Sequence, residues 1–256
     1  MARLVIDQIP VLSDNYVYLV HEPEAARTAV VDPAEAEPVL NRAEAMGWRI
    51  THILNTHHHG DHVGGNLEIK ARTGCTIIGP RADAARIPGI DHAVGTGDTV
   101  RLGTATAAVL DVPGHTRGHI AYHFAADDAL FCGDTLFSLG CGRMFEGTPP
   151  QFWDSLRILR ALPDGTRVFC AHEYTESNLR FALSIDPANA ALQARGREVE
   201  RLRAAGLPTV PSILSEEKQA NPFLRADDPD LAARLGLAAA APEVVFAEVR
   251  GRKDRF

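Results

Sequence analysis

The chain has 256 residues, of which 45% are hydrophobic and 23% charged, and its formal net charge is −7. Such a chain can form one large domain or two smaller ones and can remove roughly three quarters of its unfolded surface from water, so disordered and fibrous classes are excluded. The negative charge argues against nucleic acid as a partner, because phosphates are neutralised by a basic face.

The N-terminal residues show no basic segment followed by an apolar stretch, and no run of 18 apolar residues occurs. The four cysteines form no CxxC pair and lie in or beside apolar runs, which favours small buried side chains in a reducing compartment. We therefore expect a cytoplasmic protein that does not bind a membrane. A monomer is the default expectation, since nothing in the sequence indicates an oligomeric state.

The first part of the chain alternates short apolar runs with turn-forming residues. A helix is expected around Pro38, which suits a first turn, and Gly47 can take the left-handed position after its end. A strand over residues 50–55 then leads directly into Thr56, so the histidine-rich segment that follows lies on a strand-to-helix loop. The β-branched and aromatic runs before the helix predict strands over residues 4–9, 16–20 and 28–31.

Strands continue in the middle of the chain, and helices follow. Thr148 begins a capping-box pattern with proline at the first helical position, and Pro163 ends that helix. After residue 174 the strand pattern disappears, which predicts a mixed α/β domain over residues 1–174 and a smaller helical domain over residues 175–256. The expected strands are 75–78, 105–112, 119–124, 129–132 and 167–171, and the expected later helices are 176–185 and 189–205.

Residues 56–62 contain the pattern His-x-His-x-Asp-His. On a tight loop His57 and His59 can direct their imidazoles at one point, while Asp61 and His62 turn toward a second point a few ångströms away. Imidazole and carboxylate are ligands for zinc and related metals, and a catalytic site needs three protein ligands with one position open. The loop therefore provides four donors for two sites, and more donors must come from elsewhere. His58 should point away from its neighbours.

Three further donors stand where hydrophobic strands end, namely His115, Asp134 and His172. A rigid scaffold usually presents functional side chains in this way. An aspartate has two oxygens, so Asp134 can bridge two cations, and the donor count then closes. The alternative for the loop alone is a solvated turn or an adventitious metal-binding tract, and the three strand-end donors weigh against both. The remaining isolated histidines favour core or surface roles: His21, His52, His92, His119 and His123.

These donors resemble the metal signature of the metallo-β-lactamase superfamily, and the text around them resembles glyoxalase II, the hydroxyacylglutathione hydrolases. The resemblance runs from end to end of the chain and implies a metallo-β-lactamase αββα sandwich followed by a smaller α-helical C-terminal domain. Its segments are Asp14–Tyr16, Val63–Asn66, Gly133–Phe137, Gly140–Arg143, Glu146–Thr148, His172–Thr175, Asn221–Arg225 and Arg250–Asp254.

The resemblance also implies two divalent metal ions per chain. The first would be held by His57, His59 and His115, and the second by Asp61, His62 and His172, with Asp134 bridging them. Among these, Asp134, Asp61 and His59 are the residues we expect closest to the chemistry. Zinc is the expected metal, and nitrogen and oxygen donors would also accept iron or manganese.

By the same resemblance, the glutathione moiety would be bound by Arg143, Phe145, Tyr174, Arg250 and Lys253. Better-known members have lysine in place of Arg143, which changes the geometry of the cation, and tyrosine in place of Phe145, which adds a hydroxyl. Independently of the family, Arg250 and Lys253 at i, i+3 can form a clamp for carboxylates, because an acidic protein needs local cations for an anionic substrate. The alternative is a solvated basic tail.

The predicted reaction is hydrolysis of S-(2-hydroxyacyl)glutathione thioesters, typically S-D-lactoylglutathione, to glutathione and D-lactate, the second step of methylglyoxal detoxification. Two cations lower the pKa of a bridging water toward roughly 7, so a hydroxide exists at neutral pH and attacks the carbonyl. A metal stabilises the oxyanion. The leaving thiolate, whose parent thiol has a pKa of about 8.5, departs without a general acid.

Other activities of the same fold are possible alternatives. A glutathione persulfide dioxygenase would also handle glutathione adducts, and the basic helical tail weighs against it. A catalytically silent metal-binding module is disfavoured by the complete donor set. Hydrolases of β-lactams or lactones stay open, whereas an RNA hydrolase lacks its basic face.

Overall fold

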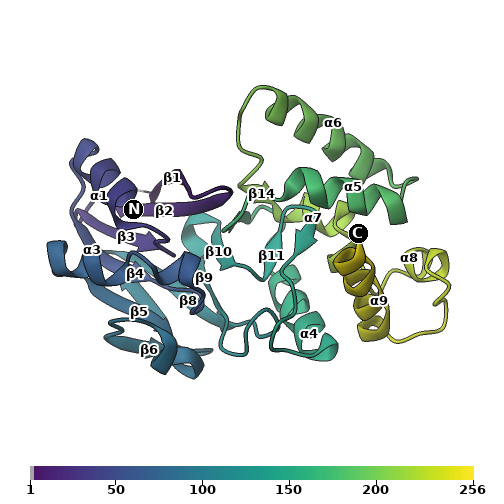
Figure 1. Cartoon of the computed structure of the whole chain (residues 1–256), viewed down its shortest axis with the longest axis horizontal. Coiled ribbons are helices and arrows are strands. Elements are labelled where there is room, and N and C mark those ends of the chain that lie inside the picture. Colours follow the sequence, from purple (N-terminus) through teal and green to yellow (C-terminus); the bar gives the residue numbers. More distant parts are fainter. Residues whose placement is uncertain (1–2) are drawn as a thin grey trace. The chain divides into compact units, whose positions relative to one another are not determined.

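The computed structural model describes residues 3–256, so Met1 and Ala2, the start of the segment in which we expect no signal peptide, lie outside it. The chain divides into two compact units (Figure 1). Unit 1 runs to Asp111 and also includes Arg117–Gly133, and unit 2 comprises Val112–Thr116 and Asp134–Phe256. This division follows internal packing, and the domain boundary expected near residue 174 stays a prediction.

Unit 1 contains a six-stranded sheet in which sequence order and spatial order agree. The first three strands pair antiparallel, and the last four pair parallel. Parallel neighbours need a crossover connection, which helices supply between them. The strands are β1 (Val5–Val11), β2 (Asn15–Glu22), β3 (Arg27–Val31), β4 (Ile50–Leu54), β5 (Thr76–Pro80) and β6 (His92–Val94).

A second set of strands in unit 1 is wholly antiparallel, in the order β10-β9-β8-β7. Tyr18 of the first sheet and Phe131 of this set meet edge to face, with ring centroids 5.5 Å apart. Every residue of β9 and β10 is buried, as expected of strands covered on both faces. The strands are β7 (Thr99–Leu102), β8 (Ala105–Asp111), β9 (Ile120–Phe124) and β10 (Ala129–Gly133).

Helices of unit 1 pack on the first sheet. Val39 of α1 and Ile69 of α3 belong to one buried apolar cluster with Ile53 and Ile77 of the strands. Gly47 follows α1 with φ +66°, the left-handed conformation expected there. The helical elements are α1 (Ala36–Ala45), α2 (Gly60–Val63), α3 (Asn66–Thr73), and the 3₁₀ turns η1 (Arg81–Arg86) and η2 (Ala125–Asp127).

Unit 2 is mainly helical, and its last helix packs against its first. Phe246 of α9 meets Phe152 of α4 at a ring distance of 5.5 Å, so the C-terminal helix is anchored in the core of the unit. The elements are β11 (Leu136–Phe137), β12 (Gly140–Cys141), α4 (Pro149–Arg160), β13 (Arg167–Cys170), α5 (Thr175–Ile185), α6 (Ala190–Ala204), β14 (Ser212–Ile213), α7 (Leu214–Ala220), η3 (Pro222–Leu224), α8 (Pro229–Arg234) and α9 (Pro242–Arg255).

Most expected elements are present with ends shifted by one or two residues. The capping box of α4 is confirmed, with the backbone N–H of Thr148 donating to the Gln151 side chain at 3.1 Å. The expectation that strands cease after residue 174 is wrong at one place, because β14 pairs with β13 through Ser212 and Val168. Two residues are too few to carry an alternating pattern, which is why β14 could not be read from the sequence.

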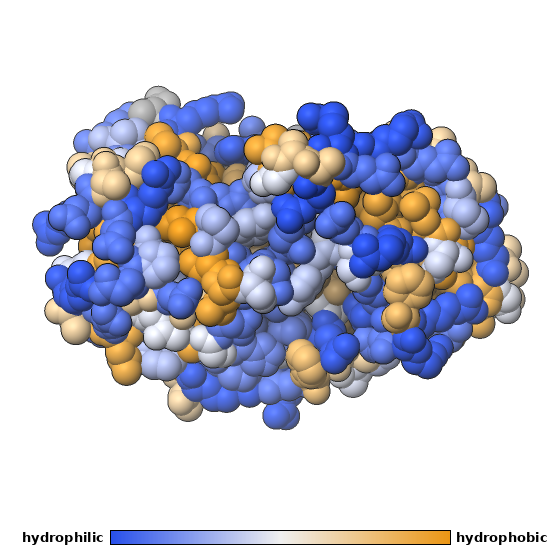
Figure 2. Space-filling view, turned by 45° about the horizontal axis from the view of Figure 1, so that its top comes forward, coloured by the Kyte–Doolittle hydropathy of each residue, from blue (hydrophilic) through white to orange (hydrophobic). Residues whose placement is uncertain are grey.

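The surface is mostly hydrophilic on the face shown in Figure 2, where apolar residues form separate small areas. No helix among residues 3–256 is long and apolar enough to cross a membrane. All four cysteines are buried and none forms a disulfide, which confirms that they are small buried side chains.

Candidate metal centre and substrate-binding residues

Unit 1 contributes the donors of the loop between β4 and α2. The Nε2 of His57 and the Nδ1 of His59 lie 3.1 Å apart. The ring of His62 lies 4.0 Å from that of His57, and its Nε2 is 3.5 Å from an oxygen of Asp61. The loop therefore gathers four candidate metal donors within unit 1, and their division between two cations stays a prediction.

Asp32, which the sequence analysis did not single out, holds this loop. It follows β3 with φ +50° and is 3% exposed. One carboxylate oxygen accepts the backbone N–H of Thr56 at 2.7 Å, and the other accepts the Thr56 hydroxyl at 2.6 Å and lies 3.1 Å from Nδ1 of His62. With Nδ1 donating to this carboxylate, Nε2 of His62 is left for a cation, a common arrangement around metal-binding histidines. The sequence feature that could have identified Asp32 is the Asp-Pro pair directly after a buried strand.

Other neighbours of the loop are also within unit 1. The side-chain amide of Asn15 donates to Asp61 at 3.0 Å. His58 turns toward Asp83, with a distance of 3.0 Å between Nδ1 and the carboxylate. His119, interpreted from the sequence as a core or surface residue, is buried and stacks on His57 at a ring distance of 4.6 Å. It was missed because nothing in its local sequence indicates that contact.

Unit 2 contributes the remaining three donors, and they converge on Asp134. One oxygen of Asp134 lies 3.4 Å from Nε2 of His115, and the other lies 3.3 Å from Nε2 of His172. All three side chains are buried. Each oxygen of one carboxylate thus faces a different imidazole, which is the arrangement a bridging aspartate requires.

These distances fit a metal centre. Two donors bound about 2.0–2.1 Å from the same tetrahedral cation lie roughly 3.4 Å apart. The pairs Asp61 with His62, His115 with Asp134, and His172 with Asp134 all fall between 3.3 and 3.5 Å. Within each unit the donor chemistry and spacing therefore suit a divalent cation.

The imidazole of His115 is oriented by the backbone. Its Nδ1 lies 2.7 Å from the carbonyl oxygen of Arg143, and because a carbonyl only accepts, Nδ1 carries the proton and Nε2 faces Asp134. Gly142 makes this approach possible, since a Cβ there would stand 1.9 Å from the backbone oxygen of Asp134 and 3.1 Å from Nδ1 of His115. Only glycine fits at this position.

Two of the predicted substrate residues present aromatic faces beside these donors. Phe145 is 59% exposed, and its ring lies 5.3 Å from that of His115. Tyr174 is 39% exposed and stacks parallel on His172 at 4.7 Å. Phe137 contacts both Tyr174 and His172 edge to face. An exposed apolar surface thus adjoins the buried donors of unit 2.

Arg143 places its side chain and its backbone in different surroundings. The guanidinium is exposed, with Nε 3.6 Å from Asp254 and Cζ 5.9 Å from the centre of the Phe145 ring. Its backbone carbonyl, in contrast, binds His115. The residue therefore offers an accessible cation while its main chain orients a metal donor.

Lys253 and Arg250, three residues apart on α9, contact different groups of unit 2. Lys253 donates to the carbonyl and hydroxyl of Ser177 at 3.1 and 3.0 Å. Burial lowers the pKa of Lys253 to about 8, helped by the charges of Arg250 and Arg180. Arg250 is 6% exposed and donates to the carbonyl of Cys141 at 3.0 Å and to Asp254 at 2.9 Å.

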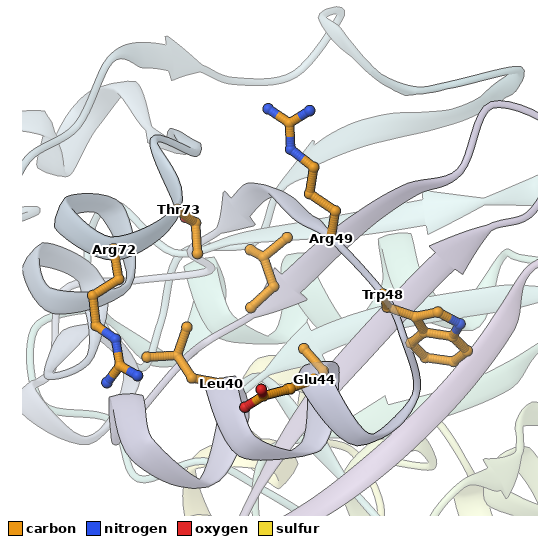
Figure 3. Close-up of a pocket in the computed structure, with 8 residues that line it drawn as sticks. Leu40, Glu44, Trp48, Arg49, Arg72 and Thr73 are labelled. Carbon is orange, nitrogen blue, oxygen red and sulfur yellow. The ribbon is translucent and has the colours of Figure 1, made fainter.

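A pocket in unit 1 lies among other residues. Figure 3 shows Leu40 and Glu44 of α1 opposite Arg72 and Thr73 of α3, with the Arg49 guanidinium directed away from Leu40. Arg72 is paired with Glu37. The lining residues include none of the donors assigned above, so this pocket is separate from the candidate metal site.

Comparison with known proteins covers the whole chain. The model of the metallo-β-lactamase superfamily matches residues 12–172, and the model described as hydroxyacylglutathione hydrolase C-terminus matches residues 173–256. The predicted fold class, a metallo-β-lactamase domain followed by a helical C-terminal domain, is thereby confirmed.

Individual relatives agree. The chain is 63% identical to a hydroxyacylglutathione hydrolase of Methylococcus capsulatus, covering 99% of both chains, and 61% identical to one of Rhodospirillum rubrum over the full length of both. Among solved structures, ETHE1 from Myxococcus xanthus is 26% identical, with a TM-score of 0.68 and coverage of 97% of this chain and 98% of that one.

Proposed function

Because the chain belongs to the hydroxyacylglutathione hydrolase family of the metallo-β-lactamase superfamily, we propose that it hydrolyses S-(2-hydroxyacyl)glutathione thioesters, typically S-D-lactoylglutathione. The products are glutathione and D-lactate, as in the second step of methylglyoxal detoxification. The observation that carries the proposal is the buried set His115, Asp134 and His172 next to the exposed rings of Phe145 and Tyr174. We further propose that the protein acts in the cytoplasm as a monomer.

The donor chemistry fits two divalent cations, zinc first, with iron or manganese also compatible. We assign His57, His59 and His115 to one cation, and Asp61, His62 and His172 to the other, with Asp134 serving both. The sequence signature and the family support this assignment, as do the donor distances within each unit. When bound, such cations supply a Lewis acid for the thioester carbonyl and lower the pKa of water toward roughly 7.

The protein's own residues orient the reactants. Asp32 and the carbonyl of Arg143 fix the tautomers of His62 and His115, and Asn15 holds Asp61, so the donors are positioned before substrate arrives. His59, Asp61 and Asp134 lie closest to the chemistry in this assignment. The leaving thiolate comes from a thiol with a pKa of about 8.5, so no side chain has to protonate it during the reaction.

Substrate binding is assigned to unit 2. Phe145 and Tyr174 offer flat apolar faces, and Arg143 and Lys253 offer cations for the two carboxylates of glutathione. Arg250 completes the set expected from the family, and its guanidinium is buried.

The test is hydrolysis of S-D-lactoylglutathione, followed by the loss of thioester absorbance, with metal content measured on the same sample. We expect turnover and two divalent ions per chain. Oxygen consumption with glutathione persulfide, in the absence of thioester hydrolysis, would overturn the proposal in favour of the dioxygenase alternative. Light scattering gives the molar mass and decides whether the chain is a monomer.

A further inference from the structure

We propose that Thr209 is a positioning residue for Tyr174, whose ring it keeps in place by binding the residues on both sides of it. The inference rests on the proposed function only in assigning Tyr174 to the glutathione moiety. The contacts that carry it all lie within unit 2.

Tyr174 stands at the start of helix α5, where a capping side chain is usual. It occupies the N-cap position, which favours serine, threonine, aspartate and asparagine because their side chains accept a backbone N–H of the first turn. The Tyr174 side chain makes no such bond. Its ring instead stacks parallel on His172 at 4.7 Å, with Phe137 edge to face at 5.4 Å. The local device that usually fixes the start of a helix is thus replaced by an aromatic side chain.

Thr209, in the loop after α6, binds both chain neighbours of Tyr174. Its backbone N–H donates to one carboxylate oxygen of Glu173 at 2.8 Å, and its hydroxyl donates to the other at 2.6 Å. The same hydroxyl lies 2.6 Å from that of Thr175. Because its one hydrogen goes to the carboxylate, which only accepts, the Thr175 hydroxyl is the donor in this second contact. One threonine oxygen therefore links residues 173 and 175 across Tyr174.

Thr209 is itself fixed from the side of α6. It is 3% exposed, and its carbonyl accepts from the guanidinium of Arg195 at 2.8 Å. Arg195 is also paired with Glu198 at 2.8 Å, so the donor is held in turn. The N–H, carbonyl and hydroxyl of Thr209 all have partners, and the residue cannot turn without breaking buried hydrogen bonds. A rigid, buried support thus lies behind a tyrosine that is 39% exposed and accessible to a ligand.

The experiment compares three substitutions of buried threonines in unit 2. Thr209→Val keeps the shape of the side chain and the backbone bond to Glu173 but removes the hydroxyl. Thr209→Ser restores the hydroxyl and is the conservative rescue. Thr166→Val is the matched control, because Thr166 is buried and its hydroxyl has no hydrogen-bond partner among residues 3–256.

Steady-state kinetics give the first readout. In Thr209→Val we expect KM for S-D-lactoylglutathione to rise about three- to tenfold, the usual effect of one lost hydrogen bond, with kcat and metal content unchanged. Kinetics on a small thioester without the glutathione moiety should not change, because that substrate does not use the Tyr174 ring. Thr209→Ser and Thr166→Val should match the wild type on both substrates.

A second readout needs no activity. The chain has four tyrosines, so the ring signals of zinc-loaded protein labelled with ¹³C-tyrosine can be assigned with a Tyr174→Phe variant. Stacking on an imidazole shifts the Tyr174 ring protons upfield. We expect this shift in the wild type, Thr209→Ser and Thr166→Val, and a smaller shift in Thr209→Val. The measurement tests the inference even if the protein does not hydrolyse lactoylglutathione.

If Thr209→Val fails to fold, Thr175→Val provides the comparison, since it cuts only the link on the C-terminal side of Tyr174. A smaller rise in KM, confined to the glutathione thioester and accompanied by a smaller ring shift, supports the proposal. An equal loss on both thioesters together with loss of metal overturns it, because Thr209 would then support His172. An unchanged Tyr174 signal or an unchanged KM in Thr209→Val also overturns it, even if the melting temperature falls, and leaves Thr209 a structural residue.

Discussion

The two units orient the imidazoles of their candidate metal ligands by different means. In unit 1 the carboxylate of Asp32 faces Nδ1 of His62, whereas in unit 2 the backbone carbonyl of Arg143 accepts from Nδ1 of His115. A carboxylate orients the ring and also makes it a more basic ligand, while a neutral carbonyl is only as well placed as the main chain that carries it. The orientation of His62 in unit 1 thus depends on one side chain, and that of His115 in unit 2 depends on the main chain at Arg143.

The units also differ in what they offer a substrate. The residues assigned to glutathione all belong to unit 2, where exposed aromatic rings adjoin buried donors. In unit 1 the donors are surrounded by buried polar residues, such as Asp32 and Thr56. Variants next to the donors of unit 1 should therefore change metal binding and kcat but not substrate affinity. Variants next to the donors of unit 2 can change either kcat or substrate affinity.

The largest effect is expected where one residue serves both imidazoles of unit 2. Asp134→Ala should lower kcat roughly 10²–10³-fold, the usual effect of losing one electrostatic stabilising group, because His115 and His172 lose their common partner. Circular dichroism should stay close to wild type. Near-wild-type hydrolysis of lactoylglutathione by this variant would show that the two-metal assignment is wrong.

The next largest effect is expected at the carboxylate of Asp32 in unit 1. Asp32→Asn keeps the shape but replaces one acceptor oxygen with a donor. Either the backbone N–H of Thr56 on one oxygen, or the Thr56 hydroxyl and Nδ1 of His62 on the other, then lose their acceptor. We expect metal affinity to fall roughly 10–100-fold, measured by competition with a chromophoric chelator. Asp83→Asn is the matched control, because Asp83 faces His58 and not an assigned donor, and a loss equal to that of Asp32→Asn would contradict the comparison.

In Lys253→Met we expect the affinity for the glutathione thioester to fall without a change in kcat. A charge-assisted contact contributes about 1.5–3 kcal/mol, so KM for lactoylglutathione should rise at least about tenfold while kcat and metal content are kept. The pKa of Lys253 is lowered to about 8, chiefly by burial. Its charge is present below that pH and lost above it, so KM of the wild type should rise as pH passes through about 8.

The pH profile of KM provides the check. In Lys253→Met this rise should be absent, and with a thioester that lacks the glutathione carboxylates it should be absent even in the wild type. A rise of equal size in the variant would mean that another group titrates.

The smallest effect on KM is expected for a substitution at Phe145 of unit 2. Phe145→Tyr adds a hydroxyl at an exposed ring, where a hydrogen bond to the peptide part of glutathione is worth about 0.5–1.5 kcal/mol. We expect KM to fall by about two- to tenfold with kcat unchanged. An unchanged KM would place this ring outside the reach of the peptide.

The sequence predicted best what depends on neighbouring residues. The loop of His57 to His62 could be interpreted because its donors are adjacent in the chain and follow a buried strand. Asp32 and His119 could not, because their roles arise from contacts made after the chain has folded back, 24 residues away from Thr56 in the first case. The capping box of α4 could be predicted for the same reason, because its residues are close together in the sequence.

Arg250 and Lys253 show what local spacing leaves open, and their assignment as a pair of carboxylate-binding cations stays a prediction. Their i, i+3 separation places them as neighbours on one helix, and the sequence analysis accordingly gave them one task. The elements packed against α9 separate them, since Arg250 meets the carbonyl of Cys141 and Lys253 meets Ser177 of α5. Which neighbour a helical residue meets depends on tertiary packing, and periodicity alone does not determine it.

The burial of Cys141 has a consequence for an enzyme whose proposed product is a thiol. Burial raises the pKa of this cysteine to about 11, although the guanidinium of Arg250 lies 3.8 Å from its sulfur and favours the thiolate. At pH 7 roughly one molecule in ten thousand carries the reactive thiolate. Glutathione disulfide in the surrounding solution would thus find almost no nucleophile at Cys141, and thiol–disulfide exchange at this residue would be slow.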